Sequence, residues 1–568
     1  MSPPYGTIAR VTAPSEILDT APLRKARGAF FTPEPLARYV TDWAVRGVAD
    51  KVLEPSCGEA AFLLAAVDRL TALRDAERST TPPHLDGVEL HEASAEAARG
   101  LLADAGVSAS VRVGDFFTVD PTGSYDAVIG NPPYVRYQDF SGESRTRSRE
   151  AALRAGVPVS NLASSWAAFT IHSALFLRKG GRMGLVLPAE LLSVNYAAPI
   201  RRFLLERFAS VDLVLFDERV FPEAEVDAVL LLAEGFDEGP TDHFRVIQVR
   251  DGEGLAKSPV ARSWTPTDLD AKWTPSLLSP DALTAFANLS ASDGFVTLED
   301  WGDTTLGMVT GSNRFFALSP TKVADLGLSA SDVVRLSPPG SKHLRGLTFT
   351  KDALDELGAA GGATYLFRPS GEPSEAAWRY IEAGKVSGVN EAYKCRIRGE
   401  GYWWRVPLLK PADLLLTYMN ADTPRLCSNK AGARHLNSVH GVYLRPGLKR
   451  LAMDYLPLAS INSMTLLGAE TVGRSYGGGM LKVEPREADR LPMPSPDVVK
   501  SIKSDLALIR PQMGRLLRSG RLIEAARLVD DLLLVRELGL TRSAVKSLRD
   551  DHADLTARRS ARGGKARA

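Results

Sequence analysis

The chain of 568 residues carries 69 Lys and Arg against 68 Asp and Glu, and 44% of its residues are hydrophobic. Such a length exceeds one ordinary core and predicts two or three domains of a soluble globular protein. The near-neutral charge excludes a uniformly basic DNA-coating protein. If the protein binds nucleic acid, its positive side chains have to be gathered on one face. The N-terminus lacks the apolar core of a signal peptide, and no apolar run approaches 18 residues. Three cysteines without metal-ligand spacing favour a reducing, cytoplasmic setting, and no metal site is expected.

The first half of the chain alternates short apolar strands with helices. Strands are predicted over residues 51–54, 85–90, 110–113, 125–130, 183–188, 211–216 and 226–234, and helices over 60–70, 91–105, 161–178 and 196–208. This alternation is typical of a mostly parallel sheet with helices on both faces. We therefore expect a Rossmann-like α/β domain with a seven-stranded sheet over residues 1–260.

Polar residues stand where four of these strands end, namely Glu54, Glu89, Asp115 and Asn131. Ligands of parallel α/β sheets bind at the carboxyl ends of the strands. An acid that ends a strand commonly holds a ribose hydroxyl pair, and Gly58 lets the backbone of the first loop approach a ligand closely. A single acid of this kind is more often a helix cap or a solvated loop charge. Because all four stand at strand ends in order, they favour an adenosine site.

The stretch Asn131-Pro132-Pro133-Tyr134 follows the fourth strand directly. One interpretation of this stretch is an ordinary turn, since Asn and Pro dominate turns and each proline fixes φ and removes an N–H donor. Its place at the end of a buried strand, beside the acidic series, favours a rigid polar corner with a function.

Seven segments in this order resemble the motifs of gamma-class DNA adenine-N6 methyltransferases of type II restriction–modification systems. They are RGAFFTPEPLARYV (27–40), VLEPSCGEAAFL (52–63), GVEL (87–90), VGDFF (113–117), IGNPPY (129–134), GGRMGLVLP (180–188) and RVFPEAEVDAVLLL (219–232). The match covers the first 235 residues. One departure is that the first loop reads Gly58-Glu59-Ala60 where the family often has Gly-x-Gly.

The resemblance implies a class I methyltransferase fold with S-adenosylmethionine as the methyl donor. In such a site the Glu54 loop lies under the methionine part, Glu89 holds the ribose hydroxyls, and Asp115 with Phe116 holds the adenine. The implied cofactor-binding residues are Thr32, Glu54, Ser56, Gly58, Glu89, Asp115, Phe116, Asn131 and Pro133.

The same resemblance assigns the chemistry to the Asn-Pro-Pro-Tyr corner. The side-chain oxygen of Asn131 and the backbone oxygen of Pro132 would accept both N–H bonds of an adenine N6 amine. The amine could then become pyramidal and direct its lone pair at the methyl group. Enzymes that act on a base within a duplex flip it out and stack it on apolar or aromatic groups. Tyr134 is the expected platform, and Phe221 is either a second platform or a core residue.

The second half predicts a DNA reader over residues 261–495, of α+β character. Segments 304–318, 429–444 and 475–494 resemble motifs of the target-recognition domain in the same enzyme group. Basic and aromatic side chains cluster in YKCRIRGEGYWWRV (393–406), and positive side chains can contact phosphates or guanine. The expected DNA-binding residues are Arg396, Arg398, Arg405, Gly478 and Lys482. For each basic residue a solvated surface is the alternative, and for the glycines a flexible turn.

The C-terminal part predicts a helical appendage over residues 496–556, followed by a basic, disordered tail over 557–568. The function expected for the whole chain is site-specific methylation of N6 of adenine in double-stranded DNA, in a restriction–modification or phage-defence system. The expected partners are double-stranded DNA and a separately encoded restriction endonuclease, and the expected state is a monomer or weak dimer.

Three alternatives remain open. The first is a catalytically silent DNA-binding subunit of a defence complex. The second is transfer to RNA or to a glutamine side chain, and a reader of about 230 residues (261–495) argues against the glutamine case. The third is transfer to N4 of cytosine, where Ser or Asp commonly takes the Asn131 position.

Overall fold

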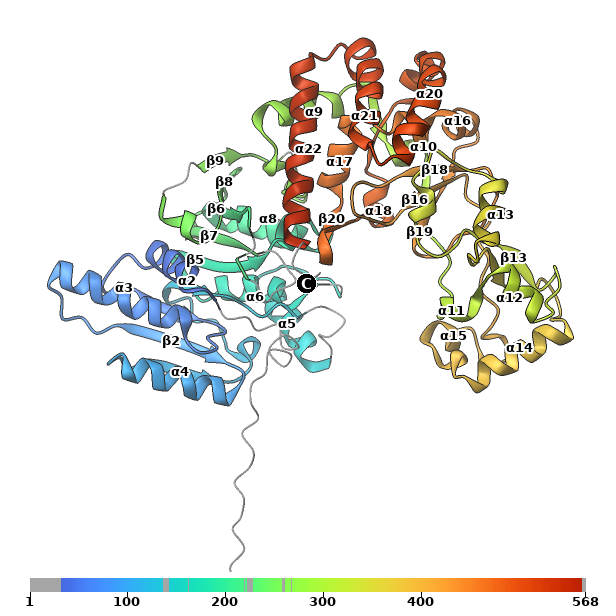
Figure 1. The fold of residues 1–568 in the computed structure, drawn as a ribbon. Helices are drawn as coiled ribbons and strands as arrows, with labels where there is room; N and C mark the ends of the chain where they lie inside the picture. Colours follow the sequence, from blue (N-terminus) through green and yellow to red (C-terminus); the bar gives the residue numbers. More distant parts are fainter. Residues whose placement is uncertain are drawn as a thin grey trace, which may run out of the picture. The chain divides into compact units, whose positions relative to one another are not determined.

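The computed structural model describes residues 32–135, 142–161, 163–218, 220–221, 228–257, 261–266 and 268–563. The chain divides into two compact units. The first runs to Leu191 and continues over Tyr196–Ala271, and the second combines Leu192–Asn195 with Lys272 onward (Figure 1). Motif residues 27–31 and 222–227 lie outside the described part, as do residues 564–568 of the predicted tail. The prediction of a disordered tail from 557 is wrong for residues 557–563, which belong to the helix Arg542–Gly563.

The first unit contains one nine-stranded sheet. Its strands are β1 (Lys51–Glu54), β2 (His84–Glu89), β3 (Ser110–Val113), β4 (Tyr125–Gly130), β5 (Leu177–Pro188), β6 (Phe208–Phe216), β7 (Ala228–Phe236), β8 (Phe244–Val249) and β9 (Ala261–Trp264). They lie in the order β3-β2-β1-β4-β5-β7-β6-β8-β9. Neighbours from β3 to β5 are parallel, as are β6 and β8, whereas β7 is antiparallel to both its neighbours and β9 is antiparallel to β8. The Rossmann-like α/β fold is therefore confirmed.

The prediction of seven strands is wrong, because β8 and β9 extend the sheet. Both fall in a segment that the sequence indicates as polar and linker-like. β9 lies at the edge of the sheet and exposes alternate side chains, so its apolar signal is weak. For the same reason the first unit extends to Ala271 rather than ending at 260.

Helices of the first unit pack on this sheet in two groups. One group is α2 (Glu34–Ala44), α3 (Ala61–Glu77) and α4 (Glu92–Asp104), which share a buried cluster with the strands. The other is α5 (Gly142–Arg154), α6 (Ser165–Ala174) and α8 (Ala198–Arg207), with α6 contacting both of the others. The predicted helix 161–178 is shorter than expected because β5 already begins at Leu177 and takes up its last residues.

The second unit is an α+β assembly of four small sheets. A five-stranded sheet has the order β11 (Gly302–Leu306), β19 (Val439–Leu444), β16 (Leu414–Thr417), β18 (Leu426–Asn429), β14 (Thr348–Phe349). The others are β12 (Ala317–Leu318) with β15 (Tyr365–Phe367) and β13 (Val333–Arg335), β17 (Met419–Asn420) with β21 (Met480–Lys482) and β20 (Arg474–Tyr476), and β10 (Phe295–Thr297) with β22 (Pro492–Pro494). The β12–β15–β13 sheet has its own aromatic core around Phe315, Trp403 and Trp404.

The C-terminal helices are not an appendage with a core of their own. They are α19 (Pro496–Ser501), α20 (Lys503–Arg518), α21 (Leu522–Asp530) and α22 (Arg542–Gly563). Leu506 and Leu548 from these helices share one buried cluster with Trp301 and Val442 from the body of the unit. Their leucine spacing buries an apolar face against the sheet region, which corrects the predicted boundary at 495.

The described residues offer neither a membrane span nor a metal cluster. No helix there combines the length and apolar character needed to cross a lipid bilayer. The same residues contain no group of three or more His, Cys, Asp or Glu placed to hold a metal ion.

Candidate active site

The candidate site lies where the two central strands of the first unit end. β1 pairs in parallel with β2 on one side and β4 on the other, so chain order reverses there. This switch point is where ligands of open α/β sheets bind. Glu54 ends β1, Glu89 ends β2 and Asn131 follows β4, so the fold brings these three predicted residues to the same edge of the sheet.

Glu54 is a buried carboxylate at the N-terminus of a helix. Only 2% of the residue is exposed, and its Oε2 accepts a 3.0 Å hydrogen bond from the amide of Leu63 in α3. Burial raises the pKa of Glu54 well above its ordinary value, repulsion from Glu89 raises it further, and the helix amides oppose both effects. A cation that binds here would therefore favour the ionised carboxylate.

Glu89 fixes the loop that follows β1. One carboxylate oxygen accepts from the amide of Gly58 at 2.8 Å, and the other accepts from His91 at 2.9 Å. A carboxylate can accept about four hydrogen bonds, so capacity for a hydroxyl pair remains. In the same loop Gly58 and Ala60 have positive φ angles of 50° and 66°. For alanine this conformation costs about 1–2 kcal/mol, which explains why glycine suits the third position of the loop. Ser56 stands half-buried in this loop.

Asp115 and Phe116 lie at the end of β3 but in different environments. Asp115 is half-buried, accepts from the amide of Phe117 at 3.0 Å and lies 3.6 Å from the guanidinium of Arg147. The ring of Phe116 is only 2% exposed and stacks at 5.3 Å on Phe169. The structure thus gives Phe116 a packing role, and its predicted contact with adenine has no exposed ring face to support it.

Leu90 is a candidate that the sequence interpretation missed. It follows Glu89 directly and is 61% exposed, although it is a large apolar residue at the mouth of the site. An exposed leucine beside an acid that ends a strand is an apolar platform next to a polar anchor. The signal that could have found it is this order of acid and leucine at the end of β2.

The side-chain amide of Asn131 differs at its two polar atoms: the nitrogen has a partner among the described residues, and the oxygen has none. Its Nδ2 donates to the hydroxyl of Thr32 at 3.2 Å. Its Oδ1 is buried and accepts no hydrogen bond from a described residue. A buried acceptor without a donor costs about 1–3 kcal/mol, so native structures keep few of them without a reason.

The remainder of the corner is held by contacts on both sides. The hydroxyl of Tyr134 donates to the carbonyl oxygen of Val186 at 3.0 Å, and burial raises the pKa of Tyr134. Ser165 at the start of α6 forms hydrogen bonds with the backbone of Pro133 and Val135. Pro132 is buried, and Pro133 is half-buried. The corner is therefore a fixed structure and not a loose turn.

Phe221 lies in the hydrophobic core of the first unit. Its side chain is 4% exposed and belongs to the buried cluster that includes β4 and α3. The neighbouring residues 222–227 lie outside the described part. Of the two interpretations of Phe221, the structure favours the core residue, and its role as a base platform stays a prediction.

The predicted DNA-binding residues separate into two groups. Arg396 and Arg405 are exposed, and the Arg405 guanidinium lies 5.9 Å from the ring of Tyr402, which is itself 59% exposed. Arg398 instead donates to the carbonyl oxygens of Val309 at 2.7 Å and Trp403 at 3.0 Å. Arg398 is therefore a structural residue of the aromatic core.

The same distinction applies to the glycine-rich hairpin. Lys482 is half-buried and pairs with Glu484 at 2.8 Å, so its charge is matched within the unit. Gly478, by contrast, is exposed at the tip between β20 and β21 with φ of 75°, and a Cβ placed there would meet no described atom within 4 Å. Gly478 keeps the geometry that a close approach to a backbone phosphate would need.

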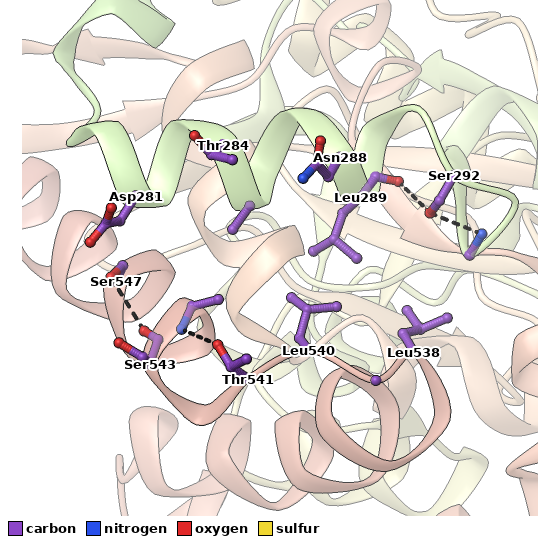
Figure 2. A pocket seen from close by; sticks show the side chains of 14 residues that line it. Asp281, Thr284, Asn288, Leu289, Ser292, Leu538, Leu540, Thr541, Ser543 and Ser547 are labelled. Atoms are coloured by element: carbon purple, nitrogen blue, oxygen red, sulfur yellow. Dashed lines mark hydrogen bonds between the residues drawn. The ribbon is translucent and has the colours of Figure 1, made fainter.

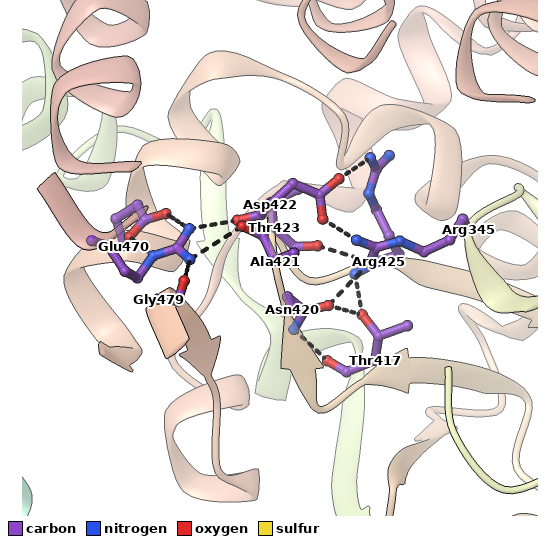
Figure 3. Close-up of polar contacts among 10 residues, drawn as sticks. Arg345, Thr417, Asn420, Ala421, Asp422, Thr423, Arg425, Glu470 and Gly479 are labelled. Carbon is purple, nitrogen blue, oxygen red and sulfur yellow. Dashed lines mark hydrogen bonds and ion pairs between the residues drawn. The ribbon is translucent and has the colours of Figure 1, made fainter. Parts of the chain in front are cut away.

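A buried arginine of the C-terminal helix contacts both the hairpin and α17 (Ser463–Val472). Arg559 of α22 is 3% exposed and pairs with Glu470 at 2.8 Å. The same guanidinium donates to the carbonyl oxygens of Gly479, Ala421 and Asp422, drawn in Figure 3. One arginine thus joins the glycine hairpin to the loop after β17.

A groove of about 650 Å³ in the second unit has no comparable chemistry. Figure 2 shows α9 (Pro280–Ser290) along one side and the segment from Leu538 to Ser547 along the other. Its lining is leucine, hydroxyl and amide side chains with Asp281 as the single ionisable group among the described lining residues. It lacks the set of acids and amides that distinguishes the strand ends of the first unit.

Comparison with known proteins covers both halves of the chain. Residues 19–257 match the family described as N-6 DNA Methylase, and residues 270–534 match the C-terminal domain of type II methyltransferase M.Eco57I. Over residues 19–257, which are fewer than half of the chain, the sequence is similar to the N-6 DNA methylase family. The matched first region contains all the residues of the candidate site, so the family resemblance seen in the motifs is confirmed.

Two type II methyltransferases match this chain over most of its length. Type II methyltransferase M.XamI of Xanthomonas campestris pv. amaranthicola is 27% identical over 484 residues, which are 82% of this chain and 85% of that protein. M.AccI of Acinetobacter calcoaceticus is 22% identical over 479 residues, with the same two shares. A solved structure of the type IIL restriction–modification enzyme MmeI in complex with DNA aligns with a TM-score of 0.58 at 11% identity, over 92% of this chain and 75% of that one. That last likeness concerns the fold.

Proposed function

We infer that the protein transfers a methyl group from S-adenosylmethionine to N6 of an adenine in double-stranded DNA, at a specific sequence. The observation that carries this proposal is the buried Oδ1 of Asn131 after β4, which accepts no hydrogen bond from any residue that the structure describes. An acceptor in that place suits a substrate that brings an N–H donor, and an exocyclic amine is such a donor. The family and its type II methyltransferase relatives support DNA as the substrate.

The chemistry requires the amine to be held in one orientation. Adenine N6 is a weak nucleophile because its lone pair is delocalised into the ring. With the oxygens of Asn131 and Pro132 accepting its two N–H bonds, the nitrogen can become pyramidal and present its lone pair. Transfer needs reacting atoms about 3–3.5 Å apart and aligned, which a rigid corner favours. No strong base is needed, because the methylated amine cation loses its proton readily.

The residues at the strand ends fit the proposed cofactor. S-adenosylmethionine, when bound, supplies an activated methyl group on a sulfonium. Buried Glu54 is suited to its cationic methionine end, because a cation offsets the cost of burying an ionised carboxylate, which is the main cause that raises the Glu54 pKa. Glu89 has acceptor capacity left for ribose hydroxyls, and Leu90 offers an apolar surface beside it.

Base flipping follows from the same proposal. An adenine inside a duplex cannot reach the end of a β-strand in a protein core, so the base has to leave the helix. Tyr134, half-buried and anchored through its hydroxyl, is the proposed stacking platform. Recognition of the site would fall to the second unit, where Arg396, Arg405 and Gly478 are exposed.

The direct test is methyl transfer in vitro. Purified protein, DNA of mixed sequence and isotopically labelled S-adenosylmethionine would be incubated together, and the DNA would be digested to nucleosides for mass spectrometry. Labelled N6-methyl-2′-deoxyadenosine from the DNA supports the proposal. Label on N4-methylcytosine, on RNA or on protein would replace it, and binding of DNA without transfer would favour a silent subunit.

A further inference from the structure

The Asn131–Tyr134 corner depends on outside contacts for its shape, because Pro132 and Pro133 have no N–H to donate. Ser165 supplies three of these contacts. Its hydroxyl donates to the carbonyl oxygen of Pro133 and accepts from the amide of Val135 at 2.9 Å, and its own amide donates to the carbonyl oxygen of Val135 at 3.1 Å. One residue at the start of α6 thus fixes the backbone on the far side of both prolines.

The start of α6 is itself held from the opposite side. The hydroxyl of Tyr196 lies 3.2 Å from the hydroxyl of Ser164 and 3.2 Å from the indole nitrogen of Trp166, and it donates to Glu190 at 2.5 Å. Burial raises the pKa of Tyr196, so the hydroxyl keeps its proton and remains a donor. The residues on each side of Ser165 are therefore anchored, which gives Ser165 a fixed position from which to hold the corner.

We propose that Ser165 is a positioning residue for methyl transfer, which sets the Pro132 and Asn131 acceptors relative to the target amine. This inference rests on the proposed function. Ser165 is 2% exposed and touches the backbone beyond the acceptors, so it acts through the corner and not on the substrate. Its hydroxyl both donates and accepts within three residues, a pattern that fixes the carbonyl and amide together.

The size of the effect follows from the sensitivity of transfer to geometry. A displacement of about 1 Å at a reacting group can cost about 100-fold in rate. Loss of the Ser165 hydroxyl leaves the amide contact to Val135 in place, so the corner should loosen and not unfold. A loss of roughly 10- to 100-fold in the methyl-transfer step is therefore expected, with little change in ligand binding.

The test uses the full chain and compares Ser165→Ala, Ser165→Thr and Ser173→Ala. Ser173 is a matched control because it lies in the same helix, is 1% exposed, and has a hydroxyl with no partner among the described residues. Four quantities are measured for each variant: the single-turnover transfer rate at saturating S-adenosylmethionine and DNA, the dissociation constant of each ligand, and the melting temperature.

The expected transfer rate of Ser165→Ala is 10- to 100-fold lower than that of the wild type, with both dissociation constants within about threefold of the wild-type values. Ser165→Thr should recover part of the transfer rate, and Ser173→Ala should keep the wild-type rate. A wild-type rate in Ser165→Ala, an equal loss in Ser165→Thr, or a loss explained by weaker cofactor binding would overturn the proposal. Failure of Ser165→Ala to fold would also overturn it, since the residue would then be needed for folding. A wild-type chain that binds both ligands but transfers no methyl group would instead refute the proposed function, and with it this inference.

Discussion

The side-chain amide of Asn131 donates a 3.2 Å hydrogen bond to the hydroxyl of Thr32, 99 positions earlier in the chain. The bond orients the amide so that its nitrogen faces Thr32 and its oxygen faces away. Among the described residues, none donates a hydrogen bond to this oxygen. The segment before α2 and the corner after β4 therefore meet at the atom on which the proposed chemistry depends.

This contact predicts the effect of Thr32→Val, which keeps the shape of the side chain and removes the hydroxyl. A neutral hydrogen bond contributes about 0.5–1.5 kcal/mol, so the single-turnover rate should fall about 3- to 10-fold as the amide loses its fixed orientation. Thr41→Val is the matched control, because the Thr41 hydroxyl is buried and has no partner among the described residues. Equal rates in the two variants would mean that Thr32 does not orient Asn131.

The raised pKa of Glu54 predicts that replacing this carboxyl with a neutral group stabilises the fold in a pH-dependent way. Its folded-state pKa is raised, so the ionised carboxylate opposes folding above the unfolded value of about 4.5. Glu54→Gln should therefore raise the melting temperature of the ligand-free protein at neutral pH. The gain should be full above the folded-state pKa and should vanish as the pH falls below the unfolded value.

Thermal unfolding from pH 4 to pH 8 measures this gain, and Glu59→Gln on the exposed part of the same loop is the control. In the same variant, affinity for S-adenosylmethionine should fall, because a neutral amide cannot match a cation. A Glu54→Gln variant that is less stable at pH 8, or a gain that grows on acidification, would show that the ionised carboxylate is favoured in the fold.

The different surroundings of Arg405 and Arg398 predict that loss of one weakens DNA binding and loss of the other lowers the melting temperature. Arg405→Ala should weaken DNA binding and reduce the salt dependence of binding by about one phosphate contact, with the melting temperature unchanged. Arg398→Ala should lower the melting temperature instead, since it leaves two backbone carbonyls without their donor. Binding isotherms at several salt concentrations and thermal unfolding distinguish these outcomes. Identical behaviour of the two variants would remove the division between surface and structural arginines.

The buried pair of Arg559 and Glu470 predicts that single changes cost more than the double change. Arg559→Met leaves Glu470 buried without a counter-charge, which typically costs about 3–5 kcal/mol. Adding Glu470→Leu should recover part of this loss, because no charge then remains buried. Denaturant unfolding of the two single variants and the double variant measures the coupling. Additive losses would mean that the pair does not act as a unit.

The sequence predicted the fold of the first unit well because its strands are buried and short. Strands at 51–54, 110–113 and 125–130 are observed with the predicted bounds, since an apolar run ended by a polar residue or a glycine marks both ends. β9 was missed because an edge strand exposes alternate side chains, and β8 was missed because its short apolar run lies within a stretch of mostly polar sequence. The C-terminal helices could not be assigned to the main core, since leucine spacing predicts a buried face and not its partner.

The candidate site was predicted more fully in backbone terms than in side-chain terms. The positions of Glu54, Glu89 and Asn131 follow from their places after successive strands of a parallel sheet. The burial of Phe116, by contrast, depends on rings supplied by α6, which no local pattern reveals. The role of Ser165 was likewise hidden, because its partners become neighbours only in the folded chain.

The central claim is that Asn131 holds an adenine amine for methylation, and single-molecule sequencing of modified DNA tests it most directly. DNA would be taken from a host without its own methylases that expresses either the wild-type chain or Asn131→Ala. The account predicts N6-methyladenine at one short motif with the wild-type chain, and none with the folded variant. N6-methyladenine at the same motif with Asn131→Ala, or a different modified base with the wild-type chain, would contradict it.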